Sequence, residues 1–331
     1  MPPTNPSPYT GKLAQKSDKK LEVYYKINSV QGLSSITTLI CGAEACVLID
    51  APFLIPDAKE VIEFIKEKTS LPLVAVFVTH HHPDHFFSAN PILEAWPESR
   101  FLAAPYVCEG IELEYEEKVK FWPSLYGDLV PKNPRKPEPY PYSFFILPGN
   151  SNSPIFLVGP VQGDSVAHSM FYLPREKAII TGDCMYSRNV HVWAAEIDTP
   201  EILSAWQNIL DLIEGLDVDL IVPGHAETED FLDKEADLAY NRKYLELFAT
   251  KITYAEKKPQ IQEIVDTFKS SFPGPKNNLD FFLGKLGDCY GEGGPGWPEN
   301  ALHHVEDYTT GDLEGFVMSE EAVKLDKNMR K

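Results

Sequence analysis

The alternation of apolar and polar residues predicts that the chain begins with strands. Runs at residues 21–27, 36–40 and 46–49 have the apolar pattern of strands, and residues 58–68 have the apolar spacing of a helix. Residues 73–79 are apolar and rich in β-branched side chains, which is typical of a buried strand. We therefore expect three strands, a helix and a further strand, in this order.

Strand and helix patterns recur along the rest of the chain. Helices are predicted at residues 86–96, 199–216, 230–250 and 260–271, and strands at residues 100–104, 155–158, 169–173, 178–181 and 219–222. Thr199 is a suitable N-cap because Pro200 follows it at the first helical position. A group of strands followed by helices thus occurs in each half, which indicates a coarse duplication.

Residues 123–154 interrupt these patterns. Within them, prolines stand at positions 131, 134, 137, 139 and 141 among charged residues and tyrosines. Proline at this density disfavours both helix and central strand, so we expect a long irregular insert, and loops of such length are commonly functional. We divide the chain into a loose segment at 1–20, a main domain at 21–250 that contains the insert, and an extension at 251–331 that ends irregularly.

The charge of the chain restricts its partners. It carries 30 Lys and Arg residues against 49 Asp and Glu residues, a formal net charge of −19. A field of this sign repels nucleic-acid phosphates and acidic membrane surfaces, so we expect neither as a partner. Five scattered cysteines without a C-x-x-C pair favour a reducing compartment. With no signal peptide and no apolar run of membrane-spanning length, we expect a soluble cytoplasmic protein.

The strongest chemical signal directly follows the predicted buried strand. Residues 80–85 read His-His-His-Pro-Asp-His, which fits His-x-His-x-Asp-His and holds four of the nine histidines of the chain. Imidazoles and a carboxylate crowded at the end of a strand are difficult to accommodate without a cation. Neutral imidazole and carboxylate are good ligands for zinc and similar ions. The cluster therefore predicts metal binding.

Two later strand ends carry further candidate ligands. Gly182 and Asp183 follow the predicted strand at 178–181, and His225 ends a Pro-Gly-His sequence after the strand at 219–222. A Gly-Asp turn or a single histidine after a strand is common and carries little information by itself. In order with the histidine cluster, the two segments are a much stronger signal.

This series of motifs resembles that of the metallo-β-lactamase superfamily. It runs from Asp50 after a strand, through the histidine cluster and a ligand-bearing turn, to Asp183 and His225, and it covers about residues 21–230. The resemblance implies an α+β fold, a four-layer αββα sandwich in which two β-sheets pack face to face between helices, with the metals at one edge. We expect the helical and irregular C-terminal extension to be added to this sandwich.

The resemblance also implies two divalent ions, which we expect to be Zn²⁺. It assigns ligands as follows: His80 and His82 with a third residue for the first ion, Asp84, His85 and His225 for the second, and Asp183 for both. Asp84 is also the predicted catalytic carboxylate, which holds the attacking hydroxide and shuttles its proton. Asp50 either orients a ligand imidazole or caps a turn.

The third ligand of the first ion is where the chain departs from the family. The family has Gly-His-Thr-Pro-Gly shortly before a strand and a Leu-Pro, whereas residues 161–169 read Val-Gln-Gly-Asp-Ser-Val-Ala-His-Ser. Counting back from the Leu-Pro at 173–174 places a carboxylate in the ligand position, and a carboxylate can replace imidazole on zinc. The candidates, in order of preference, are Asp164, His168, and Gln162 or water.

Other residues near the motifs have simpler interpretations. His81 occupies a variable position and is expected to face away from the metals. Cys184 neighbours Asp183 on an extended chain, so its side chain points the other way and packs. His191 either contacts substrate or is an ordinary loop residue. A histidine pair, His303 and His304, lies in the tail and is expected to be exposed and inert.

These features predict a metallo-hydrolase. Two divalent ions lower the pKa of a shared water toward neutrality and polarise a carbonyl, so we expect a metal-bound hydroxide to attack a small-molecule lactone, lactam, ester or thioester. Substrate choice would depend on the insert at 123–154 and on aromatic residues of the extension. Those residues form an apolar wall or simply pack against the outer helices: Phe281, Phe282, Tyr290 and Trp297.

Three other functions are compatible with parts of this pattern. A nuclease of the same superfamily would use the same metals, but the charge of −19 argues against it. A single-iron thiol dioxygenase is disfavoured because Asp84 and His225 complete a second metal site. A non-catalytic binding module would require lost ligands, and only the position of Asp164 offers such a loss.

Overall fold

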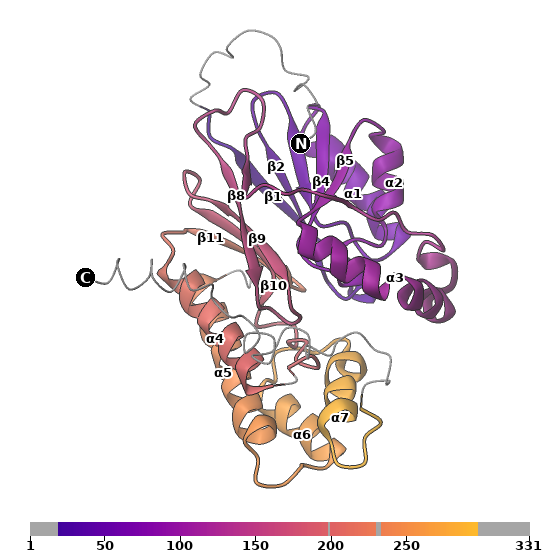
Figure 1. Cartoon of the computed structure of the whole chain (residues 1–331), viewed down its shortest axis with the longest axis vertical. Coiled ribbons are helices and arrows are strands. Elements are labelled where there is room, and N and C mark those ends of the chain that lie inside the picture. The colour runs from indigo at the N-terminus through magenta and orange to yellow at the C-terminus, as the bar shows by residue number, and fades with distance from the viewer. Residues whose placement is uncertain (1–18, 198, 230–232, 297–331) are drawn as a thin grey trace, which may run out of the picture.

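Two β-sheets form the centre of the computed structural model, which describes residues 19–197, 199–229 and 233–296 (Figure 1). The first sheet contains, in spatial order, β1 (Glu22–Ile27), β2 (Ile36–Cys41), β3 (Cys46–Ile49), β4 (Leu73–Val78), β5 (Arg100–Ala103) and β6 (Glu138–Pro139). The second contains β11 (Leu220–His225), β10 (Ala178–Tyr186), β9 (His168–Leu173), β8 (Ile155–Val161) and β7 (Phe144–Phe145).

Helices cover the outer face of each sheet. Those over the first sheet are α1 (Ile55–Lys68), α2 (Ala89–Ala95) and α3 (Pro105–Tyr126). Those of the second half are α4 (Pro200–Gly215), α5 (Lys234–Phe248), α6 (Ile261–Ser271) and α7 (Lys285–Tyr290). Short turns of 3₁₀ or π helix are η1 (Val30–Gly32), η2 (Pro83–His85), η3 (Gly127–Leu129), η5 (Ala249–Thr253) and η6 (Asp280–Gly284). Figure 1 shows α6 and α7 beside α5, beyond the end of the second sheet.

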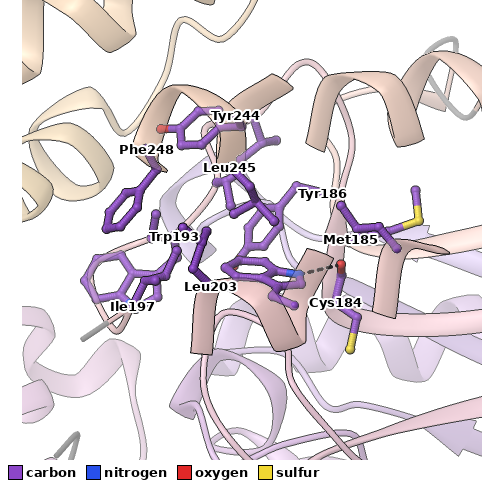
Figure 2. Close-up of a cluster of buried hydrophobic side chains, with 14 of the residues drawn as sticks. Cys184, Met185, Tyr186, Trp193, Ile197, Leu203, Tyr244, Leu245 and Phe248 are labelled. Atoms are coloured by element: carbon purple, nitrogen blue, oxygen red, sulfur yellow. Dashed lines mark hydrogen bonds between the residues drawn. The ribbon is translucent and has the colours of Figure 1, made fainter. Parts of the chain in front are cut away.

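The alternation of side chains along the strands produces three apolar layers. In β4, Val76 and Val78 pack against α1 to α3, whereas Phe77 packs against the second sheet. The opposite face of the second sheet packs against α4 to α7, where Tyr186 and Trp193 lie among other buried side chains (Figure 2). Three apolar layers between four layers of secondary structure make this the predicted αββα sandwich.

Strand direction places the functional residues at one edge. β3, β4 and β5 are parallel, and so are β10 and β11, so the carboxyl ends of each set lie together. The two sheets meet where His225 at the end of β11 forms an isolated bridge with Ser35, just before β2. The Ala226 N–H also donates to the Ser34 carbonyl at 3.1 Å. The strand ends of both sheets therefore face a common site.

The expected irregular insert is partly wrong. Residues 123–126 belong to α3, a helix of 22 residues that the sequence pattern did not predict and that tolerates Pro123 near its end. Farther along, Pro139 lies in β6 at the edge of the first sheet, where the missing N–H of proline is harmless. None of the helices in the described parts of the chain combines the length and apolar character needed to span a bilayer.

Other boundaries differ by a few residues. Thr199 is the N-cap of α4, as predicted, and its side chain accepts a hydrogen bond from the Ile202 N–H. β10 extends to Tyr186 and β11 to His225, so both strands continue beyond their predicted ends. The π turn η6 and helix α7 were not predicted; they lie in the C-terminal extension.

Candidate metal centre

The candidate ligands lie at or near the ends of strands. The histidine cluster follows β4, Asp164 lies between β8 and β9, Asp183 lies in β10, and His225 ends β11. Gly224 allows Asp183 to approach β11, because a Cβ at residue 224 would overlap the Asp183 carboxylate. The backbone therefore brings residues from both halves of the chain to one point.

Four buried side chains, which we call the first group, surround one position: His80, His82, Asp164 and Asp183. Each offers a ligand atom, and these atoms lie within 4.8 Å of one another. The Asp164 carboxylate is 3.2 Å from His82 Nδ1 and 3.8 Å from His80 Nε2. His80 Nε2 and Asp164 Oδ1 have no hydrogen-bond partner among the described residues. Buried polar atoms without partners are costly, so this arrangement fits a cation.

Asp84, His85 and His225 form the second group, whose ligand atoms also lie within 4.8 Å of one another. His85 Nδ1 is 2.9 Å from the Asp50 carboxylate, and His225 Nδ1 is 2.8 Å from the Leu33 carbonyl. Because both partners accept, each Nδ1 carries a proton, and Nε2 is the nitrogen left to bind a metal. The two Nε2 atoms are 3.3 Å apart. Two Nε2 atoms that converge beside carboxylates fit a second cation, which would take the place of their protons.

Asp183 lies between the two groups. Its carboxylate is 3.1 Å from His85 Nε2, 3.0 Å from His225 Nε2 and 4.0 Å from His80 Nε2. Burial alone would raise its pKa, but the imidazoles of His225 and His85 outweigh burial and hold the pKa well below the ordinary value. The position and charge of Asp183 are those of a bridging ligand.

The carboxylates also determine the protonation of the site histidines. Burial alone would lower the pKa values of His82 and His85, but the surrounding carboxylates raise both well above 6.5. The pKa of His80 is well below that value because burial dominates. A metal ion must therefore displace protons from His82 and His85, so its binding weakens as the pH falls.

Asp50 orients two of the imidazoles. In addition to His85, it accepts hydrogen bonds from the Thr79 N–H at 2.7 Å and the Thr79 hydroxyl at 2.8 Å. Because that hydroxyl donates to Asp50, its oxygen is free to accept from His80 Nδ1, 3.0 Å away. Of the two roles predicted for Asp50, orienting a ligand imidazole agrees with these contacts, and the bond to Thr79 N–H also caps the turn.

Glu196 and Trp193 support His82, and the sequence analysis did not identify either. His82 Nε2 lies 3.0 Å from Glu196 Oε1, which also accepts from the Trp193 indole N–H at 2.9 Å. The carboxylate therefore holds the proton of His82 on Nε2 and leaves Nδ1 for a metal. Both residues lie between β10 and α4, more than 100 positions after His82, and no local motif marks them.

Tyr186 is a further functional residue that the sequence did not reveal. Its hydroxyl lies 2.6 Å from Asp164 and 2.5 Å from Asp183, so it links carboxylates of the first group. Its ring is parallel to that of His225, with centroids 5.1 Å apart. Burial raises the pKa of Tyr186 well above its ordinary value, so the hydroxyl keeps its proton and donates it to a carboxylate.

Both principal candidates for the third ligand lie at the first group. His168 stacks on His80 with centroids 4.0 Å apart, and its Nε2 is 3.3 Å from Asp164 Oδ1. His168 Nδ1 lies 3.0 Å from the Ser165 carbonyl, to which it donates. Asp164 contacts both ligand histidines, whereas Gln162 instead donates to backbone carbonyls.

The remaining predicted residues belong to neither ligand group, although a nitrogen of His81 lies within 4.8 Å of ligand atoms of His82 and Glu196. His81 turns toward α3, with Nε2 3.6 Å from the Glu114 carboxylate. Cys184 is buried in the apolar layer beneath α4. His191 is also buried, with Nδ1 3.3 Å from the Tyr244 hydroxyl, and does not line the cavity described below. The predictions for three tail residues lie outside the described residues: Trp297, His303 and His304.

A cavity of about 730 Å³ opens over the candidate ligands. Five ligand residues line its base: His82, Asp84, Asp164, Asp183 and His225. Its sides are formed largely by the end of α3 and by residues 280–288. Within the predicted insert, only residues in the last turns of α3 contribute to this wall, while Phe281 and Phe282 contribute as predicted for the extension. Tyr290 packs elsewhere and donates to the Ala195 carbonyl at 2.8 Å.

The family model described as the metallo-beta-lactamase superfamily matches residues 31–225. A probable metallo-hydrolase of Streptococcus pyogenes serotype M6 is 26% identical over 208 residues, which cover 62% of this chain and 81% of the relative. A hydroxyacylglutathione hydrolase of Synechococcus sp. is 39% identical over 64 residues, which cover 19% of this chain and 23% of that enzyme.

A similar fold occurs in the crystal structure of metallo-beta-lactamase IND-7. The TM-score is 0.50 at 16% sequence identity, and the match covers 69% of this chain and 94% of that one. At this identity the likeness concerns the fold alone. The two-sheet sandwich is thus shared with a protein of very different sequence.

Proposed function

The chain belongs to the metallo-beta-lactamase superfamily and is a metal-dependent hydrolase, and we propose that it uses two divalent ions to cleave a carboxyl derivative. The substrates in this class are lactones, lactams, esters and thioesters. The observation that carries the proposal is the pair of adjacent ligand groups joined by Asp183. Together they form the centre of a buried site that opens into a cavity.

The two groups divide the ligands between the ions. His80, His82 and Asp164 would hold the first ion, Asp84, His85 and His225 the second, and Asp183 both. Bound divalent ions supply Lewis acidity, which lowers the pKa of water toward neutrality and polarises a substrate carbonyl. We propose zinc because imidazole nitrogen and carboxylate oxygen are among its usual ligands.

Asp84 is the residue we assign to proton transfer. Its carboxylate lines the cavity and lies 3.4 Å from His225 Nε2 and 3.6 Å from His85 Nε2. The other carboxylates of the site are more deeply buried, and Asp164 and Asp183 are linked by Tyr186. Asp84 is therefore well placed to accept a proton from an attacking water and to deliver it to the leaving group.

The burial of the site, the charge of the chain and the second ligand group favour acyl transfer to water over other uses of the same ligands. His80, His85 and His225 are almost completely buried, so bulk water is excluded from all sides except the cavity. The net charge of −19 disfavours a nucleic-acid substrate. The presence of Asp84, His85 and His225 as a complete second group favours two ions over one.

Hydrolysis of a substrate panel tests this proposal. Purified protein is incubated with a lactone, a lactam, an ester and a thioester, before and after treatment with a chelator, and the product acids are measured. We expect at least one substrate to be cleaved, the activity to disappear with the metal, and Zn²⁺ to restore it. Full activity in metal-free protein would overturn the proposal.

A further inference from the structure

We propose that the cavity binds an uncharged acyl compound that carries a flat aromatic group, with this group held between α3 and the C-terminal segment. The inference rests on the proposed function, because it names the substrate class for the same site. Its evidence is separate: it comes from the walls of the cavity, not from the ligands at its base.

The end of α3 forms one aromatic wall. Phe121, Trp122 and Tyr126 line the cavity on this side. The rings of Trp122 and Tyr126 each lie edge-on to the buried Phe53, with centroids 5.0 Å apart in both pairs. Phe53 has no exposed surface, so it fixes these two rings from below. Phe121 is 53% exposed, which leaves an apolar rim at the mouth.

The second wall comes from the C-terminal segment. Phe281 stacks on Trp193 with centroids 4.9 Å apart and an interplanar angle of 21°. On the other side, Phe281 reaches Trp122, with centroids 6.3 Å apart, so the two walls meet. Phe282 lies 6.3 Å from the ring of His225. The aromatic surface therefore continues from the mouth to a ligand of the second group, where the scissile acyl carbon would lie.

The charges around the cavity do not select an ionised substrate. Apart from the metal ligands, the lining contains three lysines and five carboxylates: Lys118, Lys120, Lys285, Glu114, Glu117, Glu196, Asp280 and Asp288. Lys118 pairs with Glu114, and Glu196 is bound by His82 and Trp193. Carboxylates outnumber lysines in this lining, so it offers no net positive charge to hold the phosphates or carboxylates of a polyanionic leaving group. Neutral aromatic compounds therefore fit the walls best.

The cavity has room for a compound with two fused rings. At about 730 Å³ the cavity lies within the usual range for small-molecule sites. Each pair of aromatic groups strengthens binding by roughly two- to tenfold beyond the effect of area burial. Such a contribution distinguishes a flat aromatic ring from a saturated ring system of similar size.

A set of matched methyl esters tests the preference. The compounds are methyl 2-naphthoate, its saturated decahydro analogue, methyl butyrate, and methyl 2-naphthoate with an added 6-carboxylate. With Zn²⁺-loaded protein we expect kcat/KM for the naphthoate to exceed that for butyrate by about 100-fold and that for the saturated ester by about tenfold. The added carboxylate is expected to lower kcat/KM for the naphthoate by about tenfold.

Binding is measured separately with 2-acetylnaphthalene, a ketone that has no leaving group. Calorimetric titration of Zn²⁺-loaded protein is expected to show saturable binding that weakens about tenfold in Trp122→Ala and in Phe281→Ala. Phe144→Ala is the matched control, because Phe144 is a half-exposed aromatic on β7 outside the cavity lining. Circular dichroism and thermal unfolding verify that each variant is folded.

The outcomes separate this inference from the proposed function. If esters are cleaved without preference for the aromatic ring and 2-acetylnaphthalene does not bind, the inference is overturned and the hydrolase proposal stands. Equal rates for the naphthoate and its saturated analogue also overturn it. If the ketone binds and both wall variants weaken it, but the substrate panel is not hydrolysed, the aromatic site stands and the proposed reaction is wrong.

Discussion

The two ligand groups at the sheet edge are supported in different ways. In the second group, Asp50 and the Leu33 carbonyl each fix the Nδ1 proton of one imidazole. In the first group, the Nδ1 proton of His80 points to the Thr79 hydroxyl, and the Nε2 proton of His82 points to the Glu196 carboxylate. The first group also has a carboxylate, Asp164, where the family has a histidine. Each group therefore offers two imidazoles and one carboxylate besides the shared Asp183, so we expect the two ions to differ in the contacts that hold their imidazoles and not in ligand charge.

The largest effect is expected from removing a ligand of the first group. His82→Ala should lower kcat/KM by more than about 100-fold without unfolding the protein. Residues that only contact a metal ligand cost at most about this much when they are changed, and a ligand itself should cost more. His81→Ala is the matched control, because His81 is adjacent in sequence but turns toward Glu114. Steady-state hydrolysis and circular dichroism compare the two variants. Equal losses of activity would show that the first group is wrongly assigned.

The next effect concerns the third ligand of the first group. Asp164→Ala should weaken the first ion more than about tenfold while the second ion stays bound, and Asp164→His should retain both ions. Metal content after dialysis against a weak chelator measures this difference. If Asp164→Ala keeps both ions and His168→Ala loses one, then His168 is the ligand and Asp164 is not.

Residues that hold the imidazole ligands in place should affect metal affinity less than the ligands do, and differently in the two groups. Glu196→Gln is expected to weaken the first ion about tenfold, because Gln cannot hold the His82 proton as a carboxylate does. Asp50→Asn should weaken both ions, since Asp50 contacts His85 directly and His80 through Thr79. Competition with a chelating dye reports each affinity. Glu60→Gln, an exposed carboxylate on α1, serves as control, and a loss there equal to that of Glu196→Gln would contradict the assignment.

The last effect concerns stability and not the metal site, and it involves His191, a buried imidazole outside both groups. Burial lowers its pKa to about 4, below the unfolded value of 6.5. The folded chain therefore binds this proton less readily than the unfolded chain, and the stability present above pH 6.5 is lost as the pH falls toward 4. In metal-free protein we expect this loss to be about 3 kcal/mol and to be absent in His191→Gln.

The unmodified protein must be compared with His191→Gln, because the raised pKa values of His82 and His85 increase the stability of the metal-free fold as the pH falls. Denaturant unfolding at pH 7 and pH 4 gives the two free energies for each protein. Parallel pH profiles for the chain and His191→Gln would show that His191 does not titrate as its burial predicts.

The candidate ligands were predicted from motifs beside recognisable strands together with the resemblance to the family. The apolar run before His80 and the Pro-Gly-His ending at His225 are local patterns, and parallel strands bring such ends together. The four-layer sandwich was predicted from the resemblance to the family, whereas the alternation of side chains predicted its individual strands. These features required no knowledge of long-range contacts.

Glu196, Trp193 and Tyr186 were missed because their roles depend on contacts between distant segments. Tyr186 reaches Asp164 across the sheet, and Glu196 approaches His82 from the loop before α4. Helix α3 was missed because charged residues interrupt its apolar spacing and a proline stands near its end. The wall of the cavity therefore differs from the irregular insert that the proline pattern predicted.

Native mass spectrometry of the intact protein tests the central claim most directly, because it counts ions on each chain. The two groups joined by Asp183 predict a hydrolytically active form with two divalent ions, which loses both ions and its activity on chelation. A fully active protein with one ion or none would contradict this account.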